Sequence, residues 1–179
     1  MTEVLQALEK FRDEVVKEAR SQLAAKGKNS SGALSKSIQG EVKQMPNSIG
    51  IYFKMLPYGN FQDKGVNGTQ INHGAPYSFK SKGGVKGLKG MPPPSKLDNW
   101  MVRKGIAPRN AGGQFTSRKG LQFLIARGIF KKGIKPSLFF TKPFEDAFRS
   151  LPDDLVEKYG LDMEQDLLTI LQENLRRMI

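Results

Sequence analysis

One histidine, His73, is the only imidazole that this sequence offers for chemistry, and the chain has no cysteine. A single imidazole without thiolate partners cannot complete a zinc site of ordinary composition. A Ser–His–Asp triad lacks its nucleophile, because no serine stands in a G-x-S-x-G turn. The absence of cysteine also excludes a disulfide scaffold and a cysteine nucleophile. We therefore expect His73, in the loop sequence NHGAP, to be chemically inert.

Carboxylates offer little more, although the stretch YGNFQDKGVNG (residues 58–68) places Asp63 beside Lys64. The only other acidic residue between positions 56 and 135 is Asp98, so a pair of general acid and base carboxylates has no obvious place. The helix dipole explains several acidic residues near the C-terminus, which we expect in first turns and on exposed helix faces. These are Asp153, Asp154, Glu157, Asp162, Glu164 and Asp166. The sequence therefore predicts a protein that is not an enzyme and has no metal or cofactor, with a hydrolase or nuclease as the weakest alternative.

Lysines and glycines are interleaved in KSKGGVKGLKG (residues 80–90), a composition seen in phosphate-binding loops. The Walker pattern needs a strand before the loop and a helix after it, whereas a triple proline at 92–94 follows here. Tyr77 and Phe79 precede the lysines, and this mixture suits contact with nucleic acid. The candidate DNA-contacting or partner-contacting residues are Lys80, Lys82, Lys86 and Lys89. Two partners stay open for them: phosphate, or the acidic C-terminal helix of a neighbouring copy.

Charge is distributed unevenly along the 179 residues, whose net charge is +12. The net charge is +3 over residues 1–55, +13 over residues 56–135 and −4 over residues 136–179. Such asymmetry is typical of a protein with a charged partner or of a self-complementary assembly. The alternative is a loop that its lysines keep in solution. The N-terminal sequence does not resemble a signal peptide, and no apolar run approaches the roughly 18 residues of a membrane span.

Apolar periodicity predicts a long N-terminal helix over residues 3–26. Its stripe consists of Val4, Leu8, Phe11, Val15, Ala19 and Leu23. Residues 33–45 and 49–55 read as two strands that form an antiparallel hairpin. A hairpin of two strands is marginal by itself, so we expect a helix or another strand to pack against it.

The second half of the chain predicts mainly helices. A capping box of Ser95 and Asp98 opens one at 96–104, and Thr116 or Ser117 caps another at about 118–131. The side chains expected to be buried on the latter are Leu121, Leu124, Ile125 and Ile129. From Pro143 a helix is expected through roughly Phe148; Pro152 starts or kinks its continuation, and Gly160 ends it. Asp162 and Gln165 then cap a last helix, whose apolar stripe is Leu161, Leu168, Leu171 and Leu175.

These elements predict an α+β fold: a small antiparallel sheet packed by N- and C-terminal helices, with a long basic insertion. We expect one domain over residues 1–179, with the inserted basic loop and helix at about 69–117.

The order of three short motifs resembles the tail-completion or neck (head–tail joining) proteins of tailed bacteriophages. The first motif leads into the hairpin, the second follows it, and the third precedes the closing helix. The matching positions are Ser31, Gly32, Leu34 and Ser37, then Tyr58, Phe61 and Gly65, and finally Pro136, Phe139 and Phe140. The resemblance covers about two thirds of the chain. The insertion at 69–117 departs from the simpler members of that family.

The resemblance implies a structural virion protein that assembles as a ring at the head–tail joint or completes the tail. Its expected partners are copies of itself, a portal-side connector and tail-tube or tail-terminator proteins. Packaged DNA is a further partner if the basic loop faces the channel, and no membrane partner is expected. Its expected location is the virion, and the host cytoplasm during assembly. The stretch 58–68 becomes a fold-motif turn in which Tyr58 and Phe61 pack the hairpin end. Gly65 and Gly68 let the chain return, and Asp63 and Lys64 are exposed. The alternative function is non-specific DNA binding through the basic 80–89 loop.

Overall fold

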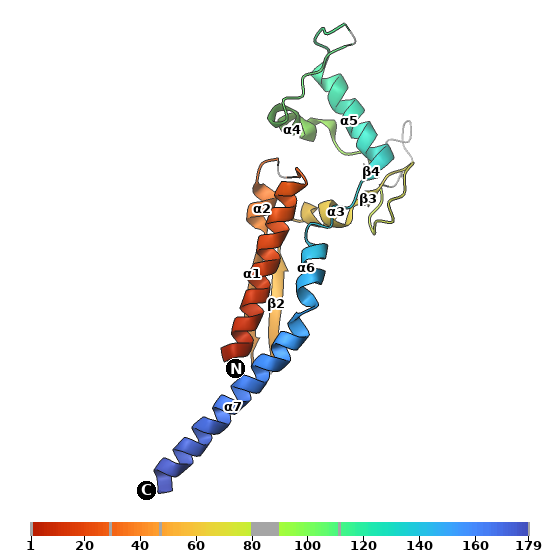
Figure 1. Ribbon diagram of the computed structural model, residues 1–179. Coiled ribbons are helices and arrows are strands. Elements are labelled where there is room, and N and C mark those ends of the chain that lie inside the picture. The colour runs from red at the N-terminus through yellow and green to blue at the C-terminus, as the bar shows by residue number, and fades with distance from the viewer. Residues whose placement is uncertain (1, 29, 47, 80–89, 111, 179) are drawn as a thin grey trace. The chain divides into compact units, whose positions relative to one another are not determined.

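Short antiparallel strand pairs and a larger number of helices give the chain an α+β fold, which confirms the predicted fold class. The computed structural model describes residues 2–28, 30–46, 48–79, 90–110 and 112–178 (Figure 1). The chain divides into two compact units. Unit 1 comprises Met1–Ala25, Leu34–Met55 and Phe139–Ile179, and unit 2 comprises Lys26–Ala33 and Leu56–Leu138. The predicted insertion lies within unit 2, and the assignment to one domain stays a prediction.

Unit 1 is built on helix α1 (Thr2–Ala25), whose apolar stripe faces a hairpin. Strands β1 (Gln39–Met45) and β2 (Ser48–Lys54) pair antiparallel, with Gln39 opposite Lys54 and Met45 opposite Ser48. Because side chains alternate along a strand, one face of the hairpin carries the partly buried Val42, Ile49, Ile51 and Phe53 that pack against α1. The buried residues of α1 are Leu8, Phe11, Val15, Ala19 and Leu23. The predicted helix and hairpin are therefore confirmed.

Helices α6 (Thr141–Phe148) and α7 (Leu151–Met178) complete unit 1. Figure 1 shows α6 beside α1 and β2, and α7 extending past the N-terminus of α1. The ring of Phe11 lies edge-on to the ring of Phe144, with centroids 5.6 Å apart, and to that of Phe53 at 6.3 Å. Edge-on aromatic pairs of this kind add to the stability that burial provides. This cluster joins α1, the hairpin and α6 into one core.

Two predictions in unit 1 are wrong in detail. Residues 33–37 form the short helix α2 (Ala33–Ser37), so the first strand begins only at Gln39. Helix α7 runs through Gly160 without a break, and Asp162 lies inside it. The Asp162 carboxylate instead accepts hydrogen bonds from the backbone N–H groups of Glu3 and Val4, both at 3.1 Å. It therefore caps the N-terminus of α1, where unpaired N–H groups need acceptors.

Unit 2 contains short elements around one longer helix. Helix α3 (Tyr58–Lys64) leads into β3 (Val66–Asn67), which pairs antiparallel with β4 (Gly133–Ile134). The 3₁₀ helix η2 (Pro94–Leu97), helix α4 (Asp98–Arg103) and helix α5 (Arg118–Lys132) make up the remainder. Its buried apolar residues are Val66, Met101, Ala126 and Phe130. No described helix of either unit has the length and apolar character that crossing a membrane requires.

Two expectations for unit 2 also change. Ser117 caps α5 as predicted, with its hydroxyl accepting from the N–H of Gly120 at 3.4 Å. The Ser95–Asp98 capping box does not form, because the carboxylate of Asp98 accepts from Gln122 Nε2 at 2.6 Å and pairs with Arg118 Nε at 2.8 Å. The predicted turn at 58–68 is a helix followed by a strand.

Candidate interaction surfaces

The aromatic residues of the predicted turn lie on helix α3 and are not deeply buried. Tyr58 is 47% exposed and Phe61 is 43% exposed. The Phe61 ring packs edge-on against Tyr77, with centroids 4.7 Å apart. Tyr77 belongs to the segment after β3, so Phe61 fixes that segment against α3 within unit 2.

Gly65 and Gly68 occupy positions where a side chain does not fit. Gly65 has φ 78°, a backbone conformation that favours glycine, and a Cβ there would lie 2.7 Å from the carbonyl oxygen of Ile134. A Cβ on Gly68 would lie 2.5 Å from the backbone nitrogen of Gly133, and closer still to the oxygen of Lys131. The chain therefore passes within van der Waals distance of the end of α5 and of β4, which only glycine permits.

Asp63 is 2% exposed, so the expectation that it is an exposed turn residue is wrong. Its carbonyl oxygen accepts hydrogen bonds from the N–H groups of Ser137 at 3.0 Å and Leu138 at 2.9 Å. Lys64 is exposed, as expected. The backbone at Asp63 is thus hydrogen-bonded to the segment that contains Ser137 and Leu138, and the side chain of Lys64 faces solvent.

His73 takes part in a loop network. The side chain of Asn67 accepts hydrogen bonds from the backbone N–H groups of His73 at 2.7 Å and Ala75 at 3.0 Å. The Nε2 atom of His73 lies 2.8 Å from the carbonyl oxygen of Lys132. These contacts hold the 67–75 loop against the end of α5. Among the described residues, no group of three or more His, Cys, Asp or Glu side chains is placed to hold a metal ion.

The four candidate lysines, Lys80, Lys82, Lys86 and Lys89, lie outside the described residues. Counted by sequence with these four lysines included, charge nevertheless separates clearly between the two units. By sequence, unit 1 carries 12 Lys or Arg and 15 Asp or Glu residues, a net charge of −3. Unit 2 carries 17 Lys or Arg and 2 Asp or Glu residues, a net charge of +15. Each unit therefore presents a field of opposite sign.

An apolar pocket lies beside α5 in unit 2, and we call it the α5 pocket. Its volume is about 620 Å³, and it is lined by Ala107, Pro108, Arg109, Thr116, Ser117, Gly120, Leu121, Phe123 and Leu124. Leu124 is 60% exposed, so the prediction that it is buried is wrong, and Phe123 is 37% exposed. The guanidinium of Arg109 stacks over the ring of Phe115, 4.2 Å from its centroid. The pocket is thus an exposed, largely apolar hollow with one cationic side chain, Arg109, in its lining.

Helix α7 carries a row of exposed apolar side chains, and we call it the α7 face. Its members are Val156, Tyr159, Met163, Leu167 and Ile170, at spacings of three and four residues that place them on one side of the helix. Their exposed fractions range from 46% to 75%. The row begins at a second apolar pocket of about 460 Å³, which Val156 and Tyr159 line together with Val4, Leu8, Ile49 and Leu155. The sequence reveals apolar periodicity here, but periodicity alone does not distinguish a buried stripe from one without a partner in its own chain.

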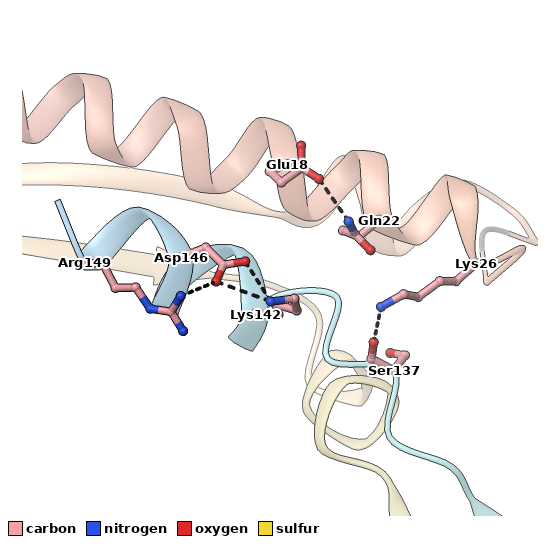
Figure 2. A network of polar contacts seen from close by, with 7 residues as sticks. All are labelled: Glu18, Gln22, Lys26, Ser137, Lys142, Asp146 and Arg149. Carbon is pink, nitrogen blue, oxygen red and sulfur yellow. Dashed lines mark hydrogen bonds and ion pairs between the residues drawn. The ribbon is translucent and has the colours of Figure 1, made fainter. Parts of the chain in front are cut away.

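The polar contacts include local ion pairs and hydrogen bonds between residues far apart in the sequence. Figure 2 shows Asp146 of α6 between Lys142 and Arg149, at 3.0 Å and 3.6 Å. In unit 2 the same figure shows the ammonium of Lys26 donating to the carbonyl of Ser137. The exposed ion pairs of Asp146 contribute little stability.

Two carboxylates have shifted pKa values. A hydrogen bond from Arg12 Nε at 2.8 Å lowers the pKa of Asp13, an exposed pair on α1. Burial acts to raise the pKa of Asp162, but hydrogen bonds that include those from Glu3 and Val4 outweigh it and lower the pKa. Asp162 is therefore held as a carboxylate by the end of α1, and its role is structural.

Comparison of the chain with models of protein families, with curated proteins and with solved structures finds no match.

Proposed function

We propose that the chain is a structural virion protein of a tailed phage, which assembles as a ring at the head–tail joint or completes the tail. The order of the three motifs supports the family assignment. The observation that carries the assembly role is the separation of charge, with −3 on unit 1 and +15 on unit 2. Oppositely charged surfaces on one chain attract other copies of that chain and steer their encounter.

The proposed mechanism is assembly without bond making or breaking. Copies of the chain join one another through unlike surfaces, and a contact between unlike surfaces closes into a ring when its rotation permits. The ring then links the portal-side connector to the tail tube. The basic residues of unit 2 either contact a neighbouring subunit or face the packaged DNA.

Negative-stain microscopy and sedimentation velocity of the purified, nuclease-treated protein test this proposal. We expect closed rings with a fixed number of subunits, in equilibrium with smaller species as the protein is diluted. A protein that stays monomeric up to the highest soluble concentration would argue against ring assembly.

Non-specific DNA binding is the second candidate, and the net charge of +15 on unit 2 favours it specifically. Duplex titrations at several salt concentrations test it, beside a variant in which Lys80, Lys82, Lys86 and Lys89 are changed to glutamine. Non-specific binders have dissociation constants of about 10⁻⁴–10⁻⁶ M at physiological salt. A dissociation constant well below that range for the wild type, with binding lost in the variant, would favour the DNA-binding function. A dissociation constant within or above that range and unchanged in the variant would indicate that the four lysines contact protein and not DNA.

A further inference from the structure

We infer that the α7 face of one copy docks in the α5 pocket of a second copy. The inference rests on the proposed function in one respect, since it names the contact through which copies join. It goes further by naming the two unlike surfaces that meet and the side chains that anchor the contact.

The α7 face has the form of a helix that binds in a groove. Val156 and Ile170 are 14 positions apart, so the row is about 21 Å long at the helical rise. Single exposed apolar residues are ordinary on a protein surface, but a continuous row of this length indicates an interaction site. Anchors at i, i+3, i+4 and i+7 are what an amphipathic helix presents to an apolar groove. Met163, Leu167 and Ile170 have this spacing and are each about half exposed.

The charge beside the α7 face determines which partner suits it. From Val156 to Glu173 the helix contains five acidic residues and one lysine, Lys158. Two α7 helices packed together would therefore bring like charges into contact, which disfavours a symmetric pair. An anionic membrane is disfavoured for the same reason. The suitable partner is an apolar pocket with a basic rim.

The α5 pocket meets this description. Its volume of about 620 Å³ falls within the range of about 300–1,000 Å³ that is common for binding pockets. Phe123 and Leu124 offer apolar surface, and Arg109 lines the pocket beside them. The exposed Lys119 and Arg127 stand four residues before and four residues after Phe123 on α5, which places them on the same side of the helix. Duplex DNA would satisfy the arginines but would leave the apolar wall of the pocket without a partner.

Because the α7 face and the α5 pocket are different surfaces, each copy carries one of each. A contact between them leaves one free surface at either end of a pair, so it can repeat until a ring closes. The same contact joins unit 1 of one copy to unit 2 of the next, which brings together the units of opposite charge.

Chemical crosslinking tests the contact directly, because the chain has no cysteine of its own. Variants Leu167→Cys and Leu124→Cys, carrying different tags, are mixed in equal amounts and treated with a short bis-maleimide. We expect crosslinks between the two variants, several-fold more abundant than crosslinks within either. The matched control replaces Leu167→Cys by Gln165→Cys, an exposed residue on the other side of α7, and should crosslink poorly. An equal yield from Gln165→Cys, or a predominance of Leu167→Cys homodimers, would overturn the inference.

Charge substitution on α7 supplies an independent measurement. The double variant Leu167→Glu and Ile170→Glu adds two negative charges to the α7 face, while Gln165→Glu and Gln172→Glu adds the same charge to the opposite side of the helix. All four positions are exposed, so both variants should retain the wild-type circular dichroism spectrum. In sedimentation velocity the first should weaken self-association by at least about tenfold, and the control should not.

The outcomes separate this inference from the proposed function. Rings that persist unchanged in the Leu167→Glu and Ile170→Glu variant would overturn the inference and leave the proposed function standing. A wild-type chain that never associates would overturn both. A Leu124→Glu variant that loses duplex binding while still forming rings would assign the α5 pocket to DNA and would also overturn the inference.

Discussion

Replacing Gly68 with alanine tests whether the backbone at Gly68 approaches the end of α5 and the start of β4 as closely as the structure shows. A Cβ at this position would lie 2.5 Å from the nitrogen of Gly133, whereas real Cβ atoms almost never approach a heavy atom within 3.0 Å. The obstructing atoms belong to the backbone and cannot rotate away as a side chain does. The segment must therefore separate from the end of α5, which breaks the hydrogen bonds from Thr69 N to Phe130 O at 3.0 Å and from Gln70 N to Lys131 O at 2.9 Å.

The expected loss of stability follows from these two effects. Overpacking typically costs about 1–3 kcal/mol, and each broken hydrogen bond adds about 1 kcal/mol. Gly68→Ala should therefore lower the free energy of unfolding by about 3–5 kcal/mol. The matched control is Gly128→Ala, in the interior of α5, where no heavy atom lies within 4 Å of the added carbon apart from the adjacent residues and the backbone of the helix itself. This control should stabilise the protein by about 0.5–1 kcal/mol, because alanine loses less conformational entropy than glycine in a helix.

Urea unfolding monitored by tryptophan fluorescence measures both changes. Trp100 is the only tryptophan of the chain and lies on α4, so its emission reports on unit 2. If Gly68→Ala lowers the free energy of unfolding by less than about 1 kcal/mol while Gly128→Ala behaves as expected, the close approach of Gly68 to the end of α5 is refuted.

Three further predictions concern helix ends and polar contacts. Gly160→Ala should stabilise unit 1 by about 0.5–1 kcal/mol and raise the helical circular dichroism signal, whereas it should do neither if a helix ended at that glycine. The folded-state pKa of Asp162 is lowered, so its contribution to stability is present above the unfolded pKa of about 3.9 and lost as the pH falls through the folded value. Wild type should therefore lose stability in an acid titration more steeply than Asp162→Asn, and equal slopes would contradict the cap. Arg118→Ala should cost less than about 1 kcal/mol because its ion pair with Asp98 is half exposed. Asp98→Ala should cost about 1–3 kcal/mol because it also removes the acceptor of the buried Gln122 amide, and equal losses for the two variants would contradict that role.

Local sequence patterns predicted the parts of the fold that local physics decides. The stripe of α1 is buried as expected because a run of apolar residues at helical spacing has one way to leave water. The hairpin follows from alternation and a short turn, and the cap at Ser117 from a hydroxyl placed before a helical sequence. Each of these signals lies within a few residues of its effect.

The predictions that were wrong depend on contacts that the local sequence does not contain. Asp162 reads as the start of a helix, yet its acceptor oxygens serve Glu3 and Val4, nearly the whole chain away. Leu124 belongs to an apolar pattern, but the buried side of α5 is formed by Gln122, Ala126 and Phe130. Apolar residues on opposite sides of a helix satisfy the same spacing rule, so the burial of one set can be decided only by tertiary packing.

The exposed length of α7 links the fold to assembly in a further way. Beyond Asp162, every side chain that the structure describes on this helix is exposed, through Glu173. In water such a segment is held mainly by its own hydrogen bonds and by continuity with the packed part of α7, because most helical stability in proteins comes from tertiary packing. The free energy needed to open this part of α7 locally is therefore among the lowest in the molecule. Docking of the α7 face in a neighbouring copy would supply the missing packing, so helix order and assembly would stabilise each other. The apolar row reduces the solubility of the isolated chain, and the acidic residues beside it offset that effect until a basic, apolar surface is met.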